Sequence, residues 1–306
     1  MNKNDERVIV YLGGGAMSGC YGAGVLKGLY DRSYVGLIED IYAGSVGSMN
    51  ASYLLSNQAE IGPTIYFEDL LQKFIFPWNI FIGTVDLVLN RFIKRIKKEK
   101  AHNVVDINYI CNILTDIKRL DLNAIISSPI NLYIKILNIN TGEVEYKSFK
   151  DHPTVDLLKA ATAVKPYFFE EILLGGNYYI DGTIKDPIGI DYLLNKYPYR
   201  KIIVVLNEPI HRGFRHYLKN FVEGIASSLY PYNISLFRLF LNRENMIRKD
   251  IQICLANKRV LLLYPNFRGR TRPRTTKLST IKKTFEDGAK DCEKIIDFIN
   301  MQIKNS

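Results

Sequence analysis

Residues 7–30 read RVIVYLGGGAMSGCYGAGVLKGLY, and residues 37–55 read LIEDIYAGSVGSMNASYLL. Each stretch begins with a short apolar, β-branched run, passes through a glycine-rich turn and continues with apolar residues at helical spacing. We therefore expect strands at 7–12 and 37–43 and helices at 20–30 and 48–55. Strands that alternate with helices are typical of a parallel sheet covered by helices on both faces. The opening of the chain thus predicts a three-layer α/β fold.

The remaining sequence continues this alternation with less regular spacing. Further strands are expected at 131–138, 143–149, 178–180, 201–206 and 259–264, and further helices at 154–163, 211–229, 233–256 and from about Thr276 onward. The segment 60–125 is expected to be mostly helical. No repeat or linker interrupts the chain, so we expect residues 1–210 and the basic, mainly helical residues 211–306 to pack as one domain.

Composition excludes several classes of protein. Of the 306 residues, 47% are hydrophobic and 24% are charged, as in globular chains and unlike disordered, collagen-like or coiled-coil ones. The best apolar stretch, residues 74–89, contains Pro77, Asn79 and Asp86, so no membrane span is expected. The polar start lacks a signal-peptide pattern, which favours a cytoplasmic protein. The four cysteines form no CxxC pair, so neither a zinc site nor a disulfide framework is expected.

Positive charge is concentrated in two parts of the chain. The net charge is +10, although residues 1–90 are net acidic. Residues 91–100 (RFIKRIKKEK) hold six basic groups and one acidic group, and residues 201–306 hold twenty and nine. A basic patch suits an anionic partner, either nucleic acid or an acidic lipid surface, and is equally compatible with an ordinary solvated face. Charge alone leaves these interpretations open.

A serine lies on the second glycine-rich turn. In Ala43-Gly44-Ser45-Val46-Gly47, small residues two before and two after Ser45 allow a sharp strand-to-helix turn that lifts its hydroxyl clear of the sheet. Ser45 is therefore a candidate nucleophile, with the N–H of Val46 as an oxyanion donor. Ala43 stands where the pattern GxSxG has glycine. The alternative interpretation is an ordinary glycine-rich turn.

The first turn, residues 13–19 (GGGAMSG), directs bare backbone N–H groups toward one point, as an oxyanion hole or a phosphate cradle requires. Gly14, Gly15 and Ala16 are the expected oxyanion donors. A dinucleotide-binding motif would have glycine in place of Ser18 and an acidic residue after the second strand. A P-loop would have the sequence Gly-Lys-Ser/Thr. The loop matches neither motif, so nucleotide binding fits poorly. An alanine at position 16 is free of strain only if its φ is negative.

The candidate base is an aspartate. Only His211 and His216 follow in the order of a Ser-Asp-His triad, and both lie in an Arg-flanked segment typical of surface histidines. Asp181 follows a short strand and precedes Gly182, so a tight turn there would aim its carboxylate at Ser45. A plain Asp-Gly turn is the alternative.

Together the three motifs resemble the patatin-like phospholipases in their bacterial form. That family has a glycine-rich oxyanion loop after the first strand, GxSxG after the second, and a distant Asp-Gly-Gly or Asp-Gly-Ala. The resemblance spans about residues 7–210 and rests on 14–19, 43–47 and 181–183, with matching flanks at 23–26, 50–51, 161–169 and 186–188. The chain departs from the family at Ala16, at Ser18 in place of Arg or Lys, and at Thr183.

The resemblance implies a three-layer α/β/α fold with a mainly parallel sheet, a catalytic domain over 1–210 and a helical C-terminal extension. It implies a serine acyl-hydrolase of lipid esters, of phospholipase A or lysophospholipase type. Ser45 and Asp181 would form the dyad, Gly14, Gly15, Ala16 and Val46 the oxyanion hole, and Ala43 and Gly47 the serine turn. No metal and no cofactor are implied.

The expected partner is then a phospholipid or another acyl-ester lipid, with peripheral contact at an anionic membrane. Residues 91–100 and the cluster Arg268, Arg270, Arg272, Arg274 and Lys277 are candidates for that contact. The aromatic residues Phe74, Phe76, Trp78 and Phe81 either insert beside them or pack in the core. Nucleic acid is not expected, because no reading motif is present. A lipid-binding protein without turnover is the alternative function, motivated by Ala16, Ser18 and Ala43.

Overall fold

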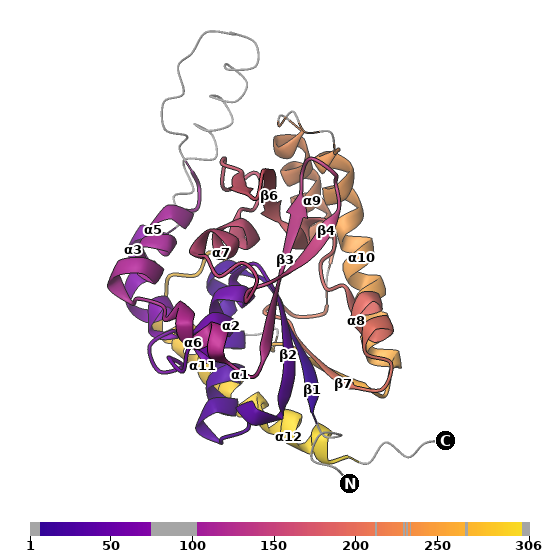
Figure 1. Ribbon diagram of the computed structural model, residues 1–306. Helices are drawn as coiled ribbons and strands as arrows, with labels where there is room; N and C mark the ends of the chain where they lie inside the picture. The colour runs from indigo at the N-terminus through magenta and orange to yellow at the C-terminus, as the bar shows by residue number, and fades with distance from the viewer. Residues whose placement is uncertain are drawn as a thin grey trace, which may run out of the picture.

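The strands join into one mainly parallel sheet. The computed structural model describes residues 7–74, 103–211, 213–228, 230, 232, 234–266 and 269–301. Within them the strand order is β5-β6-β3-β2-β1-β7-β8, with β4 paired to β3 (Figure 1). The strands are β1 (Val8–Leu12), β2 (Ile38–Gly44), β3 (Asn131–Asn138), β4 (Val144–Ser148), β5 (Ile172–Leu174), β6 (Asn177–Asp181), β7 (Lys201–Val205) and β8 (Val260–Leu263). The central pairs β3-β2-β1-β7-β8 are parallel, whereas β4, β5 and β6 pair antiparallel.

Helices connect these strands and cover the sheet. They are α1 (Cys20–Asp31), α2 (Val46–Leu55), α3 (Leu70–Lys73), α5 (Ile107–Asn112), α6 (Leu122–Ser127), α7 (Val155–Thr162), α8 (Ile190–Lys196), α9 (Phe214–Ser227), α10 (Leu236–Ala256), α11 (Leu278–Asp291) and α12 (Glu293–Asn300). Short 3-10 turns lie at Ala16–Gly19, Val35–Leu37 and Gly182–Ile184, and π-helical turns lie at Ile65–Asp69 and Ile113–Ile117.

Alternate residues of β1 face two separate helical layers. Val8, Val10 and Leu12 belong to a core shared with α1, α2, α5, α7 and α11. Ile9 and Tyr11 belong to a second core shared with α8 and α10. Because both faces of the central strands are covered, these strands are mostly apolar. The predicted three-layer α/β/α fold with its mainly parallel sheet is therefore confirmed.

The last third of the chain contributes to the same sheet and to both layers. β8 pairs with β7, and α11 packs tightly along α1. Glycines permit that close approach: a Cβ at Gly24 would lie 2.0 Å from the carbonyl oxygen of Phe285, and one at Gly288 would lie 2.2 Å from that of Tyr21. The Tyr21 hydroxyl also donates to Asp291 Oδ2 at 2.7 Å. None of the helices in the described ranges is long and apolar enough to span a bilayer.

The structure differs from the sequence prediction at a few elements. Strand β5 and helix α8 were not predicted, because three residues and seven residues are too short to show a clear period. Helix α2 begins at Val46 rather than 48, since the serine turn leads directly into it. The other predicted strands and helices are present with ends shifted by a few residues.

Candidate active site

Ser45 lies at the junction of β2 and α2. Its φ of 51° and ψ of −136° are unusual for a residue with a side chain, and such a backbone costs about 1–3 kcal/mol. A Cβ at Gly47 would lie 2.5 Å from the carbonyl oxygen of Leu12, so only glycine fits there. Ala43 is fully buried and pairs with Leu12 of β1 and Ile134 of β3. The turn is therefore as tight as its small residues predict.

The glycine loop faces Ser45 directly. A Cβ at Gly14 would lie 2.7 Å from Ser45 Cβ and 3.1 Å from its Oγ. Gly15 has a φ of 143° and Ala16 a φ of 47°. The φ of Ala16 is positive, so this residue is strained. An alanine in the left-handed conformation costs about 1–2 kcal/mol relative to its ordinary conformation. In the described part of the chain, no backbone carbonyl accepts a hydrogen bond from the N–H of Gly14, Gly15 or Ala16.

Two side chains hold this loop in place, and the sequence motifs did not point to one of them, Asn207. Asn207, just beyond β7, donates from Nδ2 to the carbonyls of Gly13 and Gly14 at 2.7 and 3.1 Å. Its Oδ1 accepts from the N–H of Gly22 at 2.8 Å. Ser18 Oγ donates to the carbonyl of Gly15 at 2.6 Å. Ser18, noted in the sequence only as a missing cation, is thus a loop-closing residue.

Strand β3 brings Asp181 to the serine turn. Gly44, the last residue of β2, pairs with Lys135, and Asp181, the last residue of β6, pairs with the next residue, Ile136. Because β4 occupies the other edge of β3 at these positions, β2 and β6 share one edge and their ends meet there. A Cβ at Gly44 would lie 2.4 Å from Thr183 Cγ2. The Ser45 and Asp181 motifs, over a hundred residues apart in the chain, are therefore neighbours.

The Asp181 carboxylate is buried and asymmetrically hydrogen-bonded. Its Oδ1 accepts from the N–H and the hydroxyl of Thr183 at 2.8 and 2.7 Å. Its Oδ2 is buried without a well-aligned hydrogen-bond partner. Burial raises the pKa of Asp181, whereas the Thr183 hydrogen bonds, the Ser45 hydroxyl and the charge of Arg243 oppose the rise. The free oxygen and the Ser45 hydroxyl are thus close enough to interact.

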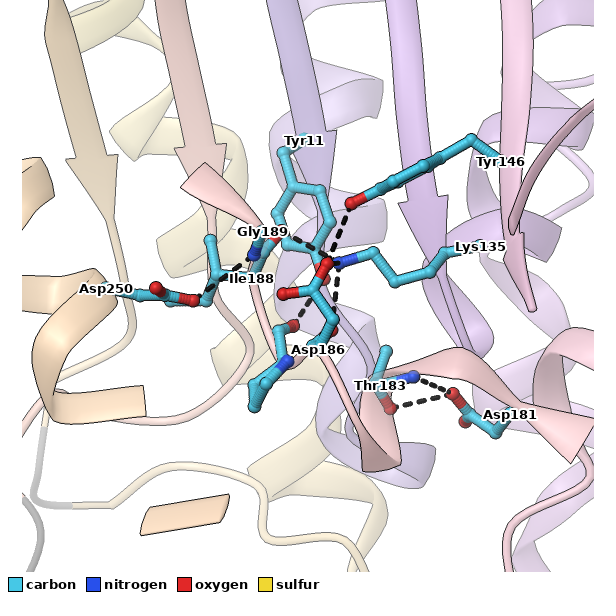
Figure 2. A network of polar contacts seen from close by, with 10 residues as sticks. Tyr11, Lys135, Tyr146, Asp181, Thr183, Asp186, Ile188, Gly189 and Asp250 are labelled. Atoms are coloured by element: carbon cyan, nitrogen blue, oxygen red, sulfur yellow. Dashed lines mark hydrogen bonds and ion pairs between the residues drawn. The ribbon is translucent and has the colours of Figure 1, made fainter. Parts of the chain in front are cut away.

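A buried cation anchors the segment that follows Asp181 (Figure 2). Lys135 Nζ, fully buried, donates to the carbonyls of Asp186 and Ile188 at 2.9 Å each and lies 3.1 Å from Asp186 Oδ2. The Tyr146 hydroxyl donates to the same carboxylate at 2.9 Å, and the Tyr11 hydroxyl donates to the carbonyl of Pro187 at 2.6 Å. This network ties residues 182–189 to β3 and β4, beside the Asp181–Thr183 pair.

The serine turn and the Asp181 motif open into one cavity of about 230 Å³. Ser45, Asp181 and the glycine loop all line it. One side is mainly apolar and comes from α2, the turn at Ile65–Asp69, α3, Phe74 and α5, with Met49, Tyr53, Leu70, Ile107 and Ile110. The other side carries charges from α9 and α10, namely Lys219, Glu223 and Arg243. In Figure 1 these helix groups stand on opposite sides of β3.

One protein family matches the part of the chain that contains these motifs. The family model described as patatin-like phospholipase matches residues 10–194, which contain all three motifs. The chain belongs to the patatin-like phospholipase family. At family level, the match supports a lipid acyl hydrolase and a lipid partner.

Two solved structures are similar at low identity. VipD from Legionella pneumophila matches with a TM-score of 0.48 and 13% identity, covering 95% of this chain and 67% of that one. The type III effector protein ExoU matches with a TM-score of 0.31 and 12% identity, covering 81% of this chain and 53% of that one. This chain thus spans about half the length of ExoU. No curated protein matches it.

Other candidate residues of this patatin-like chain fall outside the cavity or outside the described residues. Neither His211 nor His216 lines the cavity. Phe74 is buried and lines the cavity, so in this structure it packs inside. Phe76, Trp78, Phe81, Arg268 and the basic run 91–100 lie outside the described residues. In the ranges that the structure describes, no group of three or more His, Cys, Asp or Glu could hold a metal ion.

The sequence missed the charged side of the cavity. It indicated only a basic patch in residues 201–306, for an anionic partner or for solvent, but Lys219 and Arg243 line the same cavity as Ser45. Pro273 also lines it, and its carbonyl accepts from the N–H of Met17 at 3.4 Å. The basic segment 270–277 therefore runs beside the glycine loop. A lone arginine in a long amphipathic helix carries no spacing signal that would have revealed this.

Proposed function

We propose that this chain is a serine acyl-hydrolase of phospholipase A or lysophospholipase type, with Ser45 as nucleophile and Asp181 as base. One observation carries the proposal. A strained serine and a buried aspartate oxygen without a partner lie together in a cavity that the glycine loop also lines. A polar group buried without a partner costs free energy, so its presence in a cavity is typical of a functional site.

The reaction uses two proton transfers through Asp181. Ser45 Oγ attacks the ester carbonyl while its proton passes to Asp181 Oδ2, and the resulting oxyanion accepts hydrogen bonds from the loop N–H groups and from Val46. The N–H of Val46 is available because the first N–H groups of a helix have no intrahelical acceptor. Asp181 then returns the proton to the leaving alcohol, and an acyl-enzyme remains.

Water completes the cycle. Asp181 takes a proton from water as the water attacks the acyl-enzyme, and that proton then returns to Ser45 Oγ as the fatty acid leaves. The raised pKa of Asp181 helps, because a base is most effective when its pKa approaches the working pH. These groups carry every proton and the oxyanion charge themselves, so the mechanism calls on no metal or organic cofactor.

Peripheral contact with an anionic membrane is part of the proposal. Arg272, Arg274 and Lys277 are exposed on the segment whose Pro273 lines the cavity. Each basic residue near an anionic surface contributes about 1 kcal/mol to binding. Binding to vesicles that contain anionic lipid should weaken as salt rises, because salt screens these charges. Salt-independent binding would contradict the role of this segment.

Lipid binding without turnover is the second candidate. The positive φ of Ala16 favours it, because strain in the oxyanion loop opposes a fixed donor geometry. A fluorophosphonate probe and a fatty-acid release assay separate the two functions. Labelling and release that disappear in Ser45→Ala, with release also lost in Asp181→Asn, support the hydrolase. Equal release by all three proteins would disprove the dyad.

A further inference from the structure

The cavity offers different chemistry on the two sides of Ser45. Toward α2, α3 and α5 its lining is mostly aliphatic and aromatic, which suits an acyl chain. Toward α9 and α10 the lining contains Lys219, Glu223 and Arg243. An ester that lies across Ser45 with its acyl chain on the apolar side must place its alcohol part among these charges. The charged side therefore decides which alcohol fits.

The other charged residues that line the cavity, Glu208 included, already have partners. Glu223 accepts a hydrogen bond from the Tyr167 hydroxyl and lies 3.5 Å from Lys219 Nζ. On the same helix as Arg243, Arg248 pairs with Glu244 at 4.0 Å. Glu223 and Lys219 thus largely neutralise one another, and neither requires a ligand.

Arg243 has no such partner. Its Nε is buried without an acceptor, and in the part of the chain that the structure describes no carboxylate forms an ion pair with its guanidinium. A partly buried arginine without an acceptor is costly, and its planar donors match the oxygens of a phosphate. Arg243 lines the same cavity as Ser45 and Asp181, and its positive charge helps to lower the pKa of the Asp181 carboxyl.

We propose that Arg243 binds the phosphate of a phospholipid or lysophospholipid substrate and selects it over an uncharged acylglycerol. This inference rests on the proposed hydrolase for its consequence, but the binding itself does not depend on turnover. The acyl chain would occupy the apolar side and the phosphate the Arg243 side, with the ester at Ser45. Arg243 is then a specificity-determining residue that lies outside the matched family region, residues 10–194.

The test measures binding of two ether lipids that cannot be hydrolysed, in micelles of an uncharged detergent. One is 1-O-hexadecyl-lysophosphatidylcholine, and the other is 1-O-hexadecylglycerol, which lacks the phosphate. Wild type is compared with Arg243→Met and Arg243→Lys. Arg238→Met is the matched control, because Arg238 is exposed on the same helix and does not line the cavity.

We expect Arg243→Met to weaken binding of the phosphate lipid by about tenfold to a hundredfold, as for loss of a charged hydrogen-bond partner. Binding of hexadecylglycerol should change little, which also shows that the variant is folded. Arg243→Lys should retain part of the affinity, and Arg238→Met all of it. An equal effect of Arg243→Met on both lipids would overturn the proposal.

Two parallel measurements distinguish a lipid headgroup from free phosphate and binding from turnover. In the first, inorganic phosphate and glycerol 3-phosphate are tested as competitors of the phosphate lipid. Competition by glycerol 3-phosphate but not by inorganic phosphate supports a site for a lipid headgroup. Equal competition by inorganic phosphate means a site for free phosphate and overturns the assignment. Hydrolysis of the matching ester lipids is followed with the same variants. If neither ester is cleaved, the proposed hydrolase fails while the binding result still decides the role of Arg243.

Discussion

Thr183 donates two hydrogen bonds to a single oxygen of Asp181, one from its backbone N–H at 2.8 Å and one from its hydroxyl at 2.7 Å. Both bonds go to Oδ1, so Oδ2 is the oxygen that the proposed mechanism assigns to the proton of Ser45. The third residue of the aspartate motif, where the family has Gly or Ala, here orients the carboxylate and stabilises its charged form.

Replacing Thr183 should therefore shift the pH dependence of hydrolysis. The side-chain hydrogen bond lowers the pKa of Asp181, so Thr183→Val should raise that pKa further. Because the ionised aspartate is the base in the proposed mechanism, the acidic limb of kcat/KM should move to higher pH. The rate well above the limb should fall much less. A full pH–rate profile measures this, with Thr183→Ser as the control that keeps the hydroxyl; an unmoved limb in Thr183→Val would refute the assignment.

Ala16→Gly should stabilise the protein. Glycine removes the cost of a left-handed alanine, which is about 1–2 kcal/mol. It also makes the unfolded chain more flexible, which destabilises the folded state by about 0.5–1 kcal/mol. The free energy of unfolding should therefore rise by about 0.5–1 kcal/mol. Urea unfolding measures it. Ala23→Gly in helix α1 is the matched control and should destabilise the protein. If both variants lose stability alike, the φ of Ala16 carries no strain.

Lys135→Met should weaken both the fold and the reaction. The substitution leaves the Asp186 carboxylate without its cation and two carbonyls without their donor, which costs about 3–5 kcal/mol. Since the freed segment follows Asp181, kcat should fall while KM stays nearly constant. Lys249→Met, which breaks an exposed pair with Asp191, is the control and should leave thermal unfolding unchanged. A stable variant with normal kcat would show that the network does not position Asp181.

Asn207→Asp should disturb the glycine loop selectively. The substitution keeps the acceptor for the N–H of Gly22 but replaces the donor to Gly13 and Gly14 with a carboxylate oxygen that repels their carbonyls. Losing one oxyanion donor costs about 2.7–4 kcal/mol of barrier, so a loss of about 100-fold in kcat is expected. Asn245→Asp, outside the cavity, is the isosteric control. Undiminished fluorophosphonate labelling of Ser45 in Asn207→Asp would contradict the prediction.

Much of the fold and the core of the candidate site were predictable because they rest on local requirements. A buried parallel strand needs a continuous apolar run, and a sharp strand-to-helix turn needs small residues at fixed positions, as Gly44 and Gly47 illustrate. These demands act within about ten residues, so they leave a visible pattern. The short elements β5 and α8 are too brief to leave one.

The sequence alone therefore identified three candidates, Ser45, the glycine loop and Asp181, and it also indicated the three-layer architecture. The residues that surround these candidates became visible only in the tertiary structure. Asn207 holds the loop, Lys135 anchors the segment after Asp181, and Arg243 lines the same cavity as Ser45. The physical reason is that such contacts depend on strand register and on how α10 packs over the sheet. They join residues far apart in the chain, so no spacing along the sequence records them.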